Sequence, residues 1–147
     1  MKKLIALFVV LLSVAVSTPA MAGSVSVYAN PHNDGKRGNG AGMSVAMQVT
    51  DSVDVSLNYL VMNVRDGGKR IGDVRVGKSV PVAGKLSAVA EVGYGTVHDA
   101  DPSVFPVALG LKYPVTGNVA AVVKGTRYYK DDAKQDIQWT VGLAVGF

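Results

Sequence analysis

The last eleven residues of the chain, 137–147, alternate between two kinds of side chain. Every second position is apolar: Ile137, Trp139, Val141, Leu143, Val145 and Phe147. The positions between them are small or polar: Gln138, Thr140, Gly142, Ala144 and Gly146. A period of two predicts a β-strand, and neither of its faces carries a charge. Such a strand suits a barrel whose apolar outside meets lipid, and eleven tilted residues can span a bilayer.

The same alternation recurs along the chain between two kinds of connection. Tight turns fall at 51–52, 83–84 and 116–117, about 32 residues apart, and longer polar loops fall at 31–40, 66–70, 98–103 and 130–136. Short turns at one end and longer loops at the other are typical of bacterial outer-membrane barrels. The sequence therefore predicts an all-β, eight-stranded antiparallel up-and-down transmembrane β-barrel. Its strands are 24–30, 42–50, 53–64, 72–82, 86–97, 104–115, 118–129 and 137–147.

The N-terminal segment has the layout of an export signal. Lys2 and Lys3 precede an apolar run over 4–16, and the small-x-small sequence Ala20-Met21-Ala22 follows. This pattern predicts a signal peptide over 1–22 and a mature barrel domain over 23–147. Without the two lysines the formal net charge falls from +4 to +2, so no basic surface for nucleic acid is expected. The absence of cysteine excludes disulfides, a thiolate catalyst and a lipoprotein anchor.

Aromatic residues gather near the ends of the predicted strands, where a ring can be half in lipid and half in water. This predicted aromatic girdle comprises Tyr59, Tyr94, Phe105, Tyr129 and Trp139 near the loops, with Tyr113 near the turns, where Phe147 also lies. Two cations, Lys78 and Arg127, fall on the apolar face. Arg127 could meet lipid phosphates at the loop end, whereas Lys78 either snorkels to the interface or marks a β-bulge.

The inward-facing positions carry three acids and three bases: Asp54, Asp73, Glu91, Arg75, Lys112 and Lys124. Because buried charges must pair, we expect a neutral interior ion network that replaces a hydrophobic core. Counted from the turns, Arg75, Glu91 and Lys124 lie at similar heights. Small inward residues leave room for the long side chains: Gly77, Gly93, Gly95, Ala108, Gly110, Gly142 and Ala144. The alternative is a proton path or a narrow pore lined by these charges.

In this architecture, the chain resembles the small eight-stranded outer-membrane barrels of Gram-negative bacteria, the group that contains the OmpA transmembrane domain and OmpX-type proteins. The sharpest local match is a C-terminal assembly signal, polar-x-Gly-x-x-apolar-x-aromatic, which reads Thr140, Gly142, Val145 and Phe147. The resemblance implies an outer-membrane location, contact with outer-membrane lipid and lipopolysaccharide, and recognition by the barrel-assembly machinery. The loops are shorter than those of OmpX-type adhesins, which argues against an adhesive role.

Candidates for chemistry are few. His98, Asp99 and Ser103 share one short loop but lack the spacing of a nucleophile, a base and an orienting acid. We therefore predict no catalytic, cofactor or metal site, and a structural or envelope-interaction role without catalysis or a large pore. One alternative is a lipid A-modifying outer-membrane enzyme. Another is a soluble periplasmic barrel of lipocalin type, which would turn the apolar face inward.

Overall fold

The computed structural model describes residues 22–30, 40–62, 69–98, 103–130, 133–134 and 137–147. The predicted signal peptide lies outside these residues, except for Ala22, and so do parts of all four predicted loops. Within the described residues, no helix is long and apolar enough to cross a membrane.

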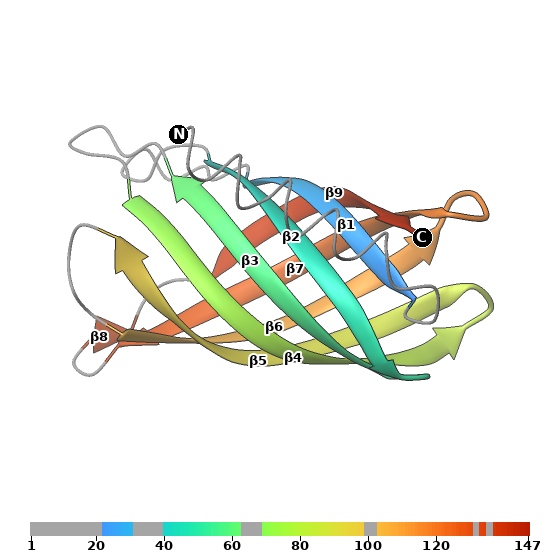
Figure 1. The fold of residues 1–147 in the computed structure, drawn as a ribbon, viewed down its shortest axis with the longest axis horizontal. Helices are drawn as coiled ribbons and strands as arrows, with labels where there is room; N and C mark the ends of the chain where they lie inside the picture. The colour runs from blue at the N-terminus through green and yellow to red at the C-terminus, as the bar shows by residue number, and fades with distance from the viewer. Residues whose placement is uncertain (1–21, 31–39, 63–68, 99–102, 131–132, 135–136) are drawn as a thin grey trace.

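The described residues form nine antiparallel β-strands, eight long and one short (Figure 1). They are β1 (Gly23–Asn30), β2 (Gly40–Thr50), β3 (Val53–Met62), β4 (Lys69–Ala83), β5 (Leu86–His98), β6 (Ser103–Pro114), β7 (Val119–Lys130), β8 (Ala133–Lys134) and β9 (Gln138–Gly146). Each strand from β1 to β7 pairs with the next, β9 pairs with β7, and β1 pairs with β9. The eight long strands therefore close into an up-and-down barrel, which confirms the predicted fold class.

Several strand ends differ from the prediction. β2 begins at Gly40 rather than at residue 42, and β4 begins at Lys69 rather than at residue 72. The short β8 lies inside the predicted loop 130–136 and pairs with the end of β7. The backbone ladder continues past the alternating pattern because hydrogen bonding between strands needs no apolar side chain. The predicted end of the third strand, residue 64, lies outside the described residues.

The barrel wall is apolar outside and largely polar inside. Leu109, Val92 and Leu143 point outward and are 67%, 58% and 54% exposed, whereas the inward Ser56 and Thr126 are 3% exposed. A water-soluble barrel has the opposite arrangement, with its apolar face inward. The exposed apolar wall is that of a barrel surrounded by lipid.

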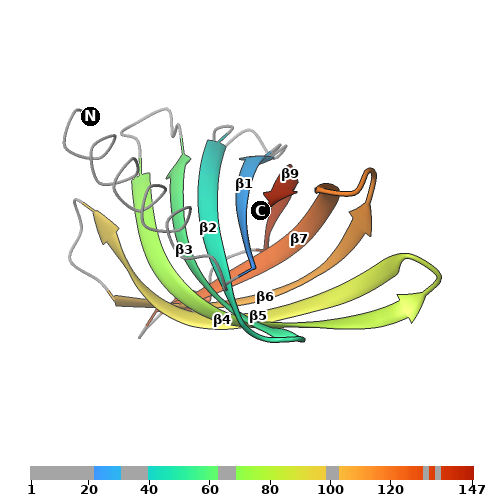
Figure 2. The same ribbon diagram turned by 45° about the vertical axis from the view of Figure 1, so that its right-hand side comes forward.

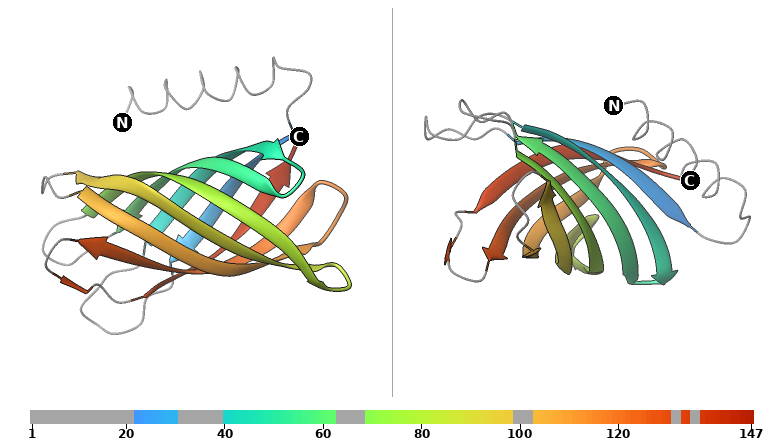
Figure 3. Two further views of the ribbon diagram at one scale, coloured as in Figure 1. Left: turned by 90° about the horizontal axis from the view of Figure 1, so that it is seen from below. Right: turned by 60° about the vertical axis from the view of Figure 1, so that its left-hand side comes forward.

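The three turns lie at one end of the barrel, and β3 and β5 end at the other, as Figure 1 shows. The β4–β5 hairpin extends beyond its neighbours at the turn end, as Figures 2 and 3 show from other sides. β3 pairs with β4 only as far as Lys78, and five further residues of β4 follow. At the tip of the β4–β5 hairpin, Gly84 has a positive φ of 53°, a conformation that favours glycine.

The interior changes character along the barrel axis. At the loop end it holds an apolar cluster of Leu60, Ile71, Val97, Val104 and Tyr128. A polar network follows at mid-height, and a cavity lies at the turn end. The expectation that a polar core replaces a hydrophobic one is therefore wrong at the loop end. There, inward-facing positions near the ends of β3 to β7 carry apolar residues, which pack together.

Candidate functional site in the barrel lumen

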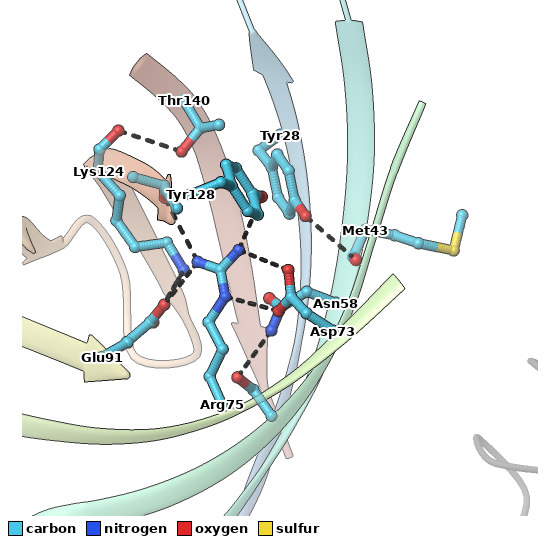
Figure 4. A network of polar contacts seen from close by, with 11 residues as sticks. Tyr28, Met43, Asn58, Asp73, Arg75, Glu91, Lys124, Tyr128 and Thr140 are labelled. Carbon is cyan, nitrogen blue, oxygen red and sulfur yellow. Dashed lines mark hydrogen bonds and ion pairs between the residues drawn. The ribbon is translucent and has the colours of Figure 1, made fainter. Parts of the chain in front are cut away.

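A network of polar side chains crosses the lumen at mid-height (Figure 4). The alternation of side chains along a strand turns Asp73 and Arg75 inward on β4, and it turns Glu91 inward on β5. On β7, every second residue also points into the lumen, toward these three side chains. We call this group the lumen network: Asp73, Arg75, Glu91, Lys124, Thr126 and Tyr128.

Arg75 lies at the centre of the network. Its Nε donates to Asp73 Oδ1 at 2.6 Å and its Nη2 to Asp73 Oδ2 at 2.9 Å, a two-pronged ion pair. Nη1 donates to Glu91 Oε2 at 3.1 Å. From β7, Tyr128 Oη accepts from Nη2 at 3.0 Å and Thr126 Oγ1 accepts from Nη1 at 3.4 Å. One guanidinium thus joins three strands, and its Cζ lies 5.8 Å from the centre of the Tyr128 ring.

Lys124 completes the network from β7. Its Nζ donates to Glu91 Oε1 at 2.9 Å and to Oε2 at 3.1 Å. The side chains of Asp73, Arg75 and Glu91 are between 1% and 7% exposed, and that of Lys124 is 14% exposed. Two acids therefore face two bases in a nearly dry interior, and their formal charges cancel. Such a group is tolerated because every charge has an opposite partner.

Glycines on neighbouring strands make room for the long side chains. Gly93 pairs with Arg75, Gly95 with Asp73, and Gly110 with Lys124. A Cβ placed on any of these glycines would contact the partner's side chain and a backbone carbonyl oxygen. The sequence prediction that small inward residues accommodate the charges matches this geometry.

Two of the six charged residues predicted for the interior lie apart from the lumen network. Asp54 and Lys112 are partly buried and line a cavity of about 520 Å³ at the turn end. The cavity opens between the turns, with Asp51 and Asn118 among its lining residues. Asp54 is the second residue of β3, and Lys112 lies two residues before the end of β6. At this height water can reach both charges, so they do not need a buried partner.

The prediction omitted Thr126 and Tyr128, the two uncharged members of the lumen network. Alternation could have identified them, because Lys124 faces inward and positions 126 and 128 share its face. Tyr128 also belongs to the apolar cluster. Its ring packs among apolar side chains while its hydroxyl accepts from Arg75, so it joins the two parts of the interior.

All six residues of the predicted aromatic girdle point outward. Five of them are between 42% and 56% exposed: Tyr94, Phe105, Tyr113, Tyr129 and Trp139. Tyr59 is partly buried. The Tyr94 and Phe105 rings pack edge to face, with centres 5.3 Å apart. Along β6, Phe105 and Tyr113 are eight residues apart, roughly 20 Å along the barrel axis at about 3.3 Å per residue and a tilt of about 40°. This spacing fits the apolar band of an outer-membrane barrel.

The two exterior cations predicted from the sequence, Lys78 and Arg127, lie in regular parts of the sheet. Lys78 pairs with Val53 on one side and Ala90 on the other, and the strand register is continuous there. Arg127 pairs with Val107 in an equally continuous ladder. The β-bulge alternative for Lys78 is therefore wrong, and both side chains belong to the outer wall.

The residues of the predicted assembly signal occupy both faces of β9 and the position after it. Thr140 points inward and its Oγ1 donates to the Lys124 carbonyl oxygen at 3.3 Å. Gly142 lies opposite Tyr28, and a Cβ on this glycine would contact the Val27 carbonyl oxygen and the Tyr28 Cβ. Val145 and Phe147 point outward and are 49% and 46% exposed. Recognition of these residues by the assembly machinery stays a prediction.

Two of the three residues weighed for catalysis, His98 and Ser103, lie among the described residues. His98 is exposed at the end of β5. The Ser103 hydroxyl lies 2.7 Å from the Tyr94 hydroxyl, with which it shares a hydrogen bond. Asp99 lies outside the described residues. Among the residues that the structure describes, no group of three or more His, Cys, Asp or Glu side chains could hold a metal ion.

Comparison with known proteins gives matches to solved structures only. No protein-family model matches the sequence, and no curated protein does. The structure is similar to the N-terminal β-barrel domain of OprF from Pseudomonas aeruginosa, with a TM-score of 0.67 and 14% identity, over 86% of this chain and 97% of that one. It is also similar to Ail of Yersinia pestis, with a TM-score of 0.60 and 16% identity, over 86% of this chain and 99% of that one.

A designed transmembrane β-barrel is similar as well, with a TM-score of 0.67 and 15% identity, over 89% of this chain and 98% of that one. The similarity to designed and natural barrels alike concerns the fold. Together with the apolar outer wall, it confirms the predicted fold of a small transmembrane β-barrel.

Proposed function

We propose that this barrel is a structural or interaction protein of the outer membrane that neither catalyses a reaction nor conducts ions. It contacts outer-membrane lipid and lipopolysaccharide with its wall, and it reaches the membrane through a cleaved signal peptide and the barrel-assembly machinery. The observation that carries this proposal is the lumen network, which crosses the interior between the two ends of the barrel.

The geometry of the network supports a closed lumen. Beside Arg75 and Lys124 the remaining space is about 10 Å³, no more than one water molecule needs. The apolar cluster lies above it at the loop end, where an ion would lose its hydration. The cavity at the turn end is a vestibule that stops at the network. A proton path or narrow pore would need a continuous polar route past both layers.

Planar-bilayer recordings of the purified barrel test the closed lumen. We expect no steady current for the wild-type protein. The matched variant Leu60→Ser adds a hydroxyl to the apolar cluster without touching an ion pair, and it should also remain silent. A steady wild-type current that disappears when Arg75 or Glu91 is replaced would support the pore alternative instead.

The enzyme alternative has its own test. Lipid A from cells that overproduce the barrel should be unchanged in mass spectrometry. The variant His98→Ala/Asp99→Ala/Ser103→Ala should give the same profile, because the Ser103 hydroxyl shares a hydrogen bond with the Tyr94 hydroxyl, which is not a catalytic base. A new acylated or deacylated species that depends on one of these residues would overturn the non-catalytic proposal.

A further inference from the structure

Arg127 is a cation on the lipid-facing wall. It lies on β7, pairs with Val107 of β6, and is partly buried. Its guanidinium Cζ lies 5.9 Å from the centre of the Tyr129 ring, two residues along the same face. This cation–π contact holds the planar group against the wall and limits the directions in which it can donate hydrogen bonds.

The side chains around Arg127 form an apolar and aromatic platform. Phe105 lies opposite Tyr129 across the β6–β7 ladder, and the two rings are 48% and 42% exposed. On the other side Trp139 lies opposite Gly125, which is two residues from Arg127. A Cβ on Gly125 would come within 3.3 Å of the Trp139 ring, so the indole packs over this glycine. The charged group is thus bordered by rings from three strands.

The height of Arg127 matches the polar boundary of a membrane. It lies three residues from the loop end of β7, roughly 8 Å along the barrel axis at about 3.3 Å per residue and a tilt of about 40°. The neighbouring rings of Phe105, Tyr129 and Trp139 belong to the loop-end aromatic girdle, which marks the level where acyl chains give way to headgroups. Lys78, another exterior cation, lies on the turn-end half of the barrel, at the opposite leaflet.

We propose that the outer wall of β6, β7 and β9 around Arg127 is a binding site for a phosphate group of lipid A. The guanidinium donates charge-assisted hydrogen bonds to the phosphate oxygens, while Trp139, on the turn-end side of Arg127, contacts the acyl chains below. This inference rests on the proposed function, because it requires the loop end to face the outer leaflet. It adds a defined site and a ligand chemistry to that function.

Trp139 provides a direct readout, because it is the single tryptophan of the chain and borders the site. The purified full-length barrel, folded in neutral detergent, is titrated with diphosphoryl lipid A while tryptophan fluorescence is followed. We expect a saturable change with the wild-type protein and an apparent affinity at least about tenfold weaker for Arg127→Gln, since a charged hydrogen-bonding partner is lost. Arg127→Lys should bind with intermediate affinity, because it keeps the charge but not the planar donor pair.

Lys78→Gln is the matched control, since it removes one exterior positive charge from the opposite leaflet. It should bind lipid A as the wild-type protein does. Equal weakening by Lys78→Gln and Arg127→Gln would mean attraction to net charge and would overturn the site. Equal responses to diphosphoryl and dephosphorylated lipid A, or to phosphatidylglycerol, would overturn it as well. Gel mobility before and after boiling establishes that each variant is folded.

Cell fractionation separates the failure of this site from the failure of the proposed function. A wild-type barrel that is absent from the outer-membrane fraction contradicts the proposed function whatever the titration gives. A barrel that is present there but shows no dependence on Arg127 contradicts the lipid A site alone.

Discussion

Glu91 is the residue whose removal tests the lumen network most directly. Its two carboxylate oxygens accept from Arg75 at 3.1 Å and from Lys124 at 2.9 and 3.1 Å. The network has no net charge with Glu91 present, and Glu91→Ala leaves it at +1. The two cations are affected differently, because Arg75 keeps its two-pronged pair with Asp73. Lys124 loses its ion-pair partner in the network.

The expected cost follows from this difference. Breaking a buried ion pair by removing one partner costs about 3–5 kcal/mol, because the remaining charge is left without compensation. Lys124 is 14% exposed, so water reaches it in part and the cost should lie near the lower limit, about 3 kcal/mol. Replacing Lys124 by Met in the Glu91→Ala background removes the positive charge that has lost its partner. The double variant should therefore be more stable than the sum of the single effects predicts, by about 1–3 kcal/mol.

Two double-mutant cycles, one for Glu91 with Lys124 and one for Glu91 with Arg75, measure these coupling energies. Each variant is unfolded in urea from lipid vesicles, and Trp139 fluorescence gives the free energy of unfolding. We expect the Glu91–Lys124 coupling to exceed the Glu91–Arg75 coupling. Arg75→Met leaves Asp73 without its ion-pair partner whether or not Glu91 is present. The loss of stability caused by Arg75→Met is therefore largely independent of Glu91. Asp54→Asn is the control for removing an interior acid, and it should cost less than about 1 kcal/mol because Asp54 borders the wide cavity.

Two results would refute this reasoning. Strict additivity of Glu91→Ala and Lys124→Met would show that the two residues are not energetic partners. A larger coupling of Glu91 to Arg75 than to Lys124 would show that the guanidinium, despite its pair with Asp73, depends on Glu91 for compensation.

Three further predictions concern packing, assembly and closure. Gly93→Ala should cost about 1–3 kcal/mol in urea unfolding, because its Cβ would contact the Val74 carbonyl oxygen and Arg75. The control Gly72→Ala should stay within about 0.5 kcal/mol, since nothing lies within 4 Å of its Cβ. Phe147→Ala should lower the amount assembled in cells far more than the stability of refolded protein; equal assembly would contradict the signal assignment. The closed barrel should migrate differently on a denaturing gel before and after boiling, because it has no free edge from which to unravel.

The sequence predicted the wall of the barrel well because lipid imposes one rule on every strand. Lipid favours apolar residues at the outward positions, so a period of two runs through the eight long strands and indicates which face each residue occupies. Strand ends were less predictable. At Lys69 and Arg70 the β4 ladder continues through residues that carry no apolar signal, since pairing with β3 holds the backbone there.

The interior was only partly predictable, because alternation gives the face of a residue but not its surroundings. The alternation pattern placed Arg75, Glu91 and Lys124 on the inward face, where the structure brings them into contact. It could not show that Leu60 and Ile71, from neighbouring strands, would pack with Val104 from across the lumen into an apolar cluster. That contact depends on barrel closure and on the stagger between strands, which no single segment encodes.

The six interior charges have different environments because they lie at different heights along the barrel axis. Asp73, Arg75, Glu91 and Lys124 lie deep enough that water is largely excluded, so each must have a partner. Asp54 and Lys112 lie beside the turns, where the cavity solvates them. If this account is right, moving the solvent boundary should change which charges need partners. A bulky apolar residue at Ser79, which lines the cavity, should make Asp54→Asn stabilising rather than nearly neutral, because the carboxylate would then lose its water.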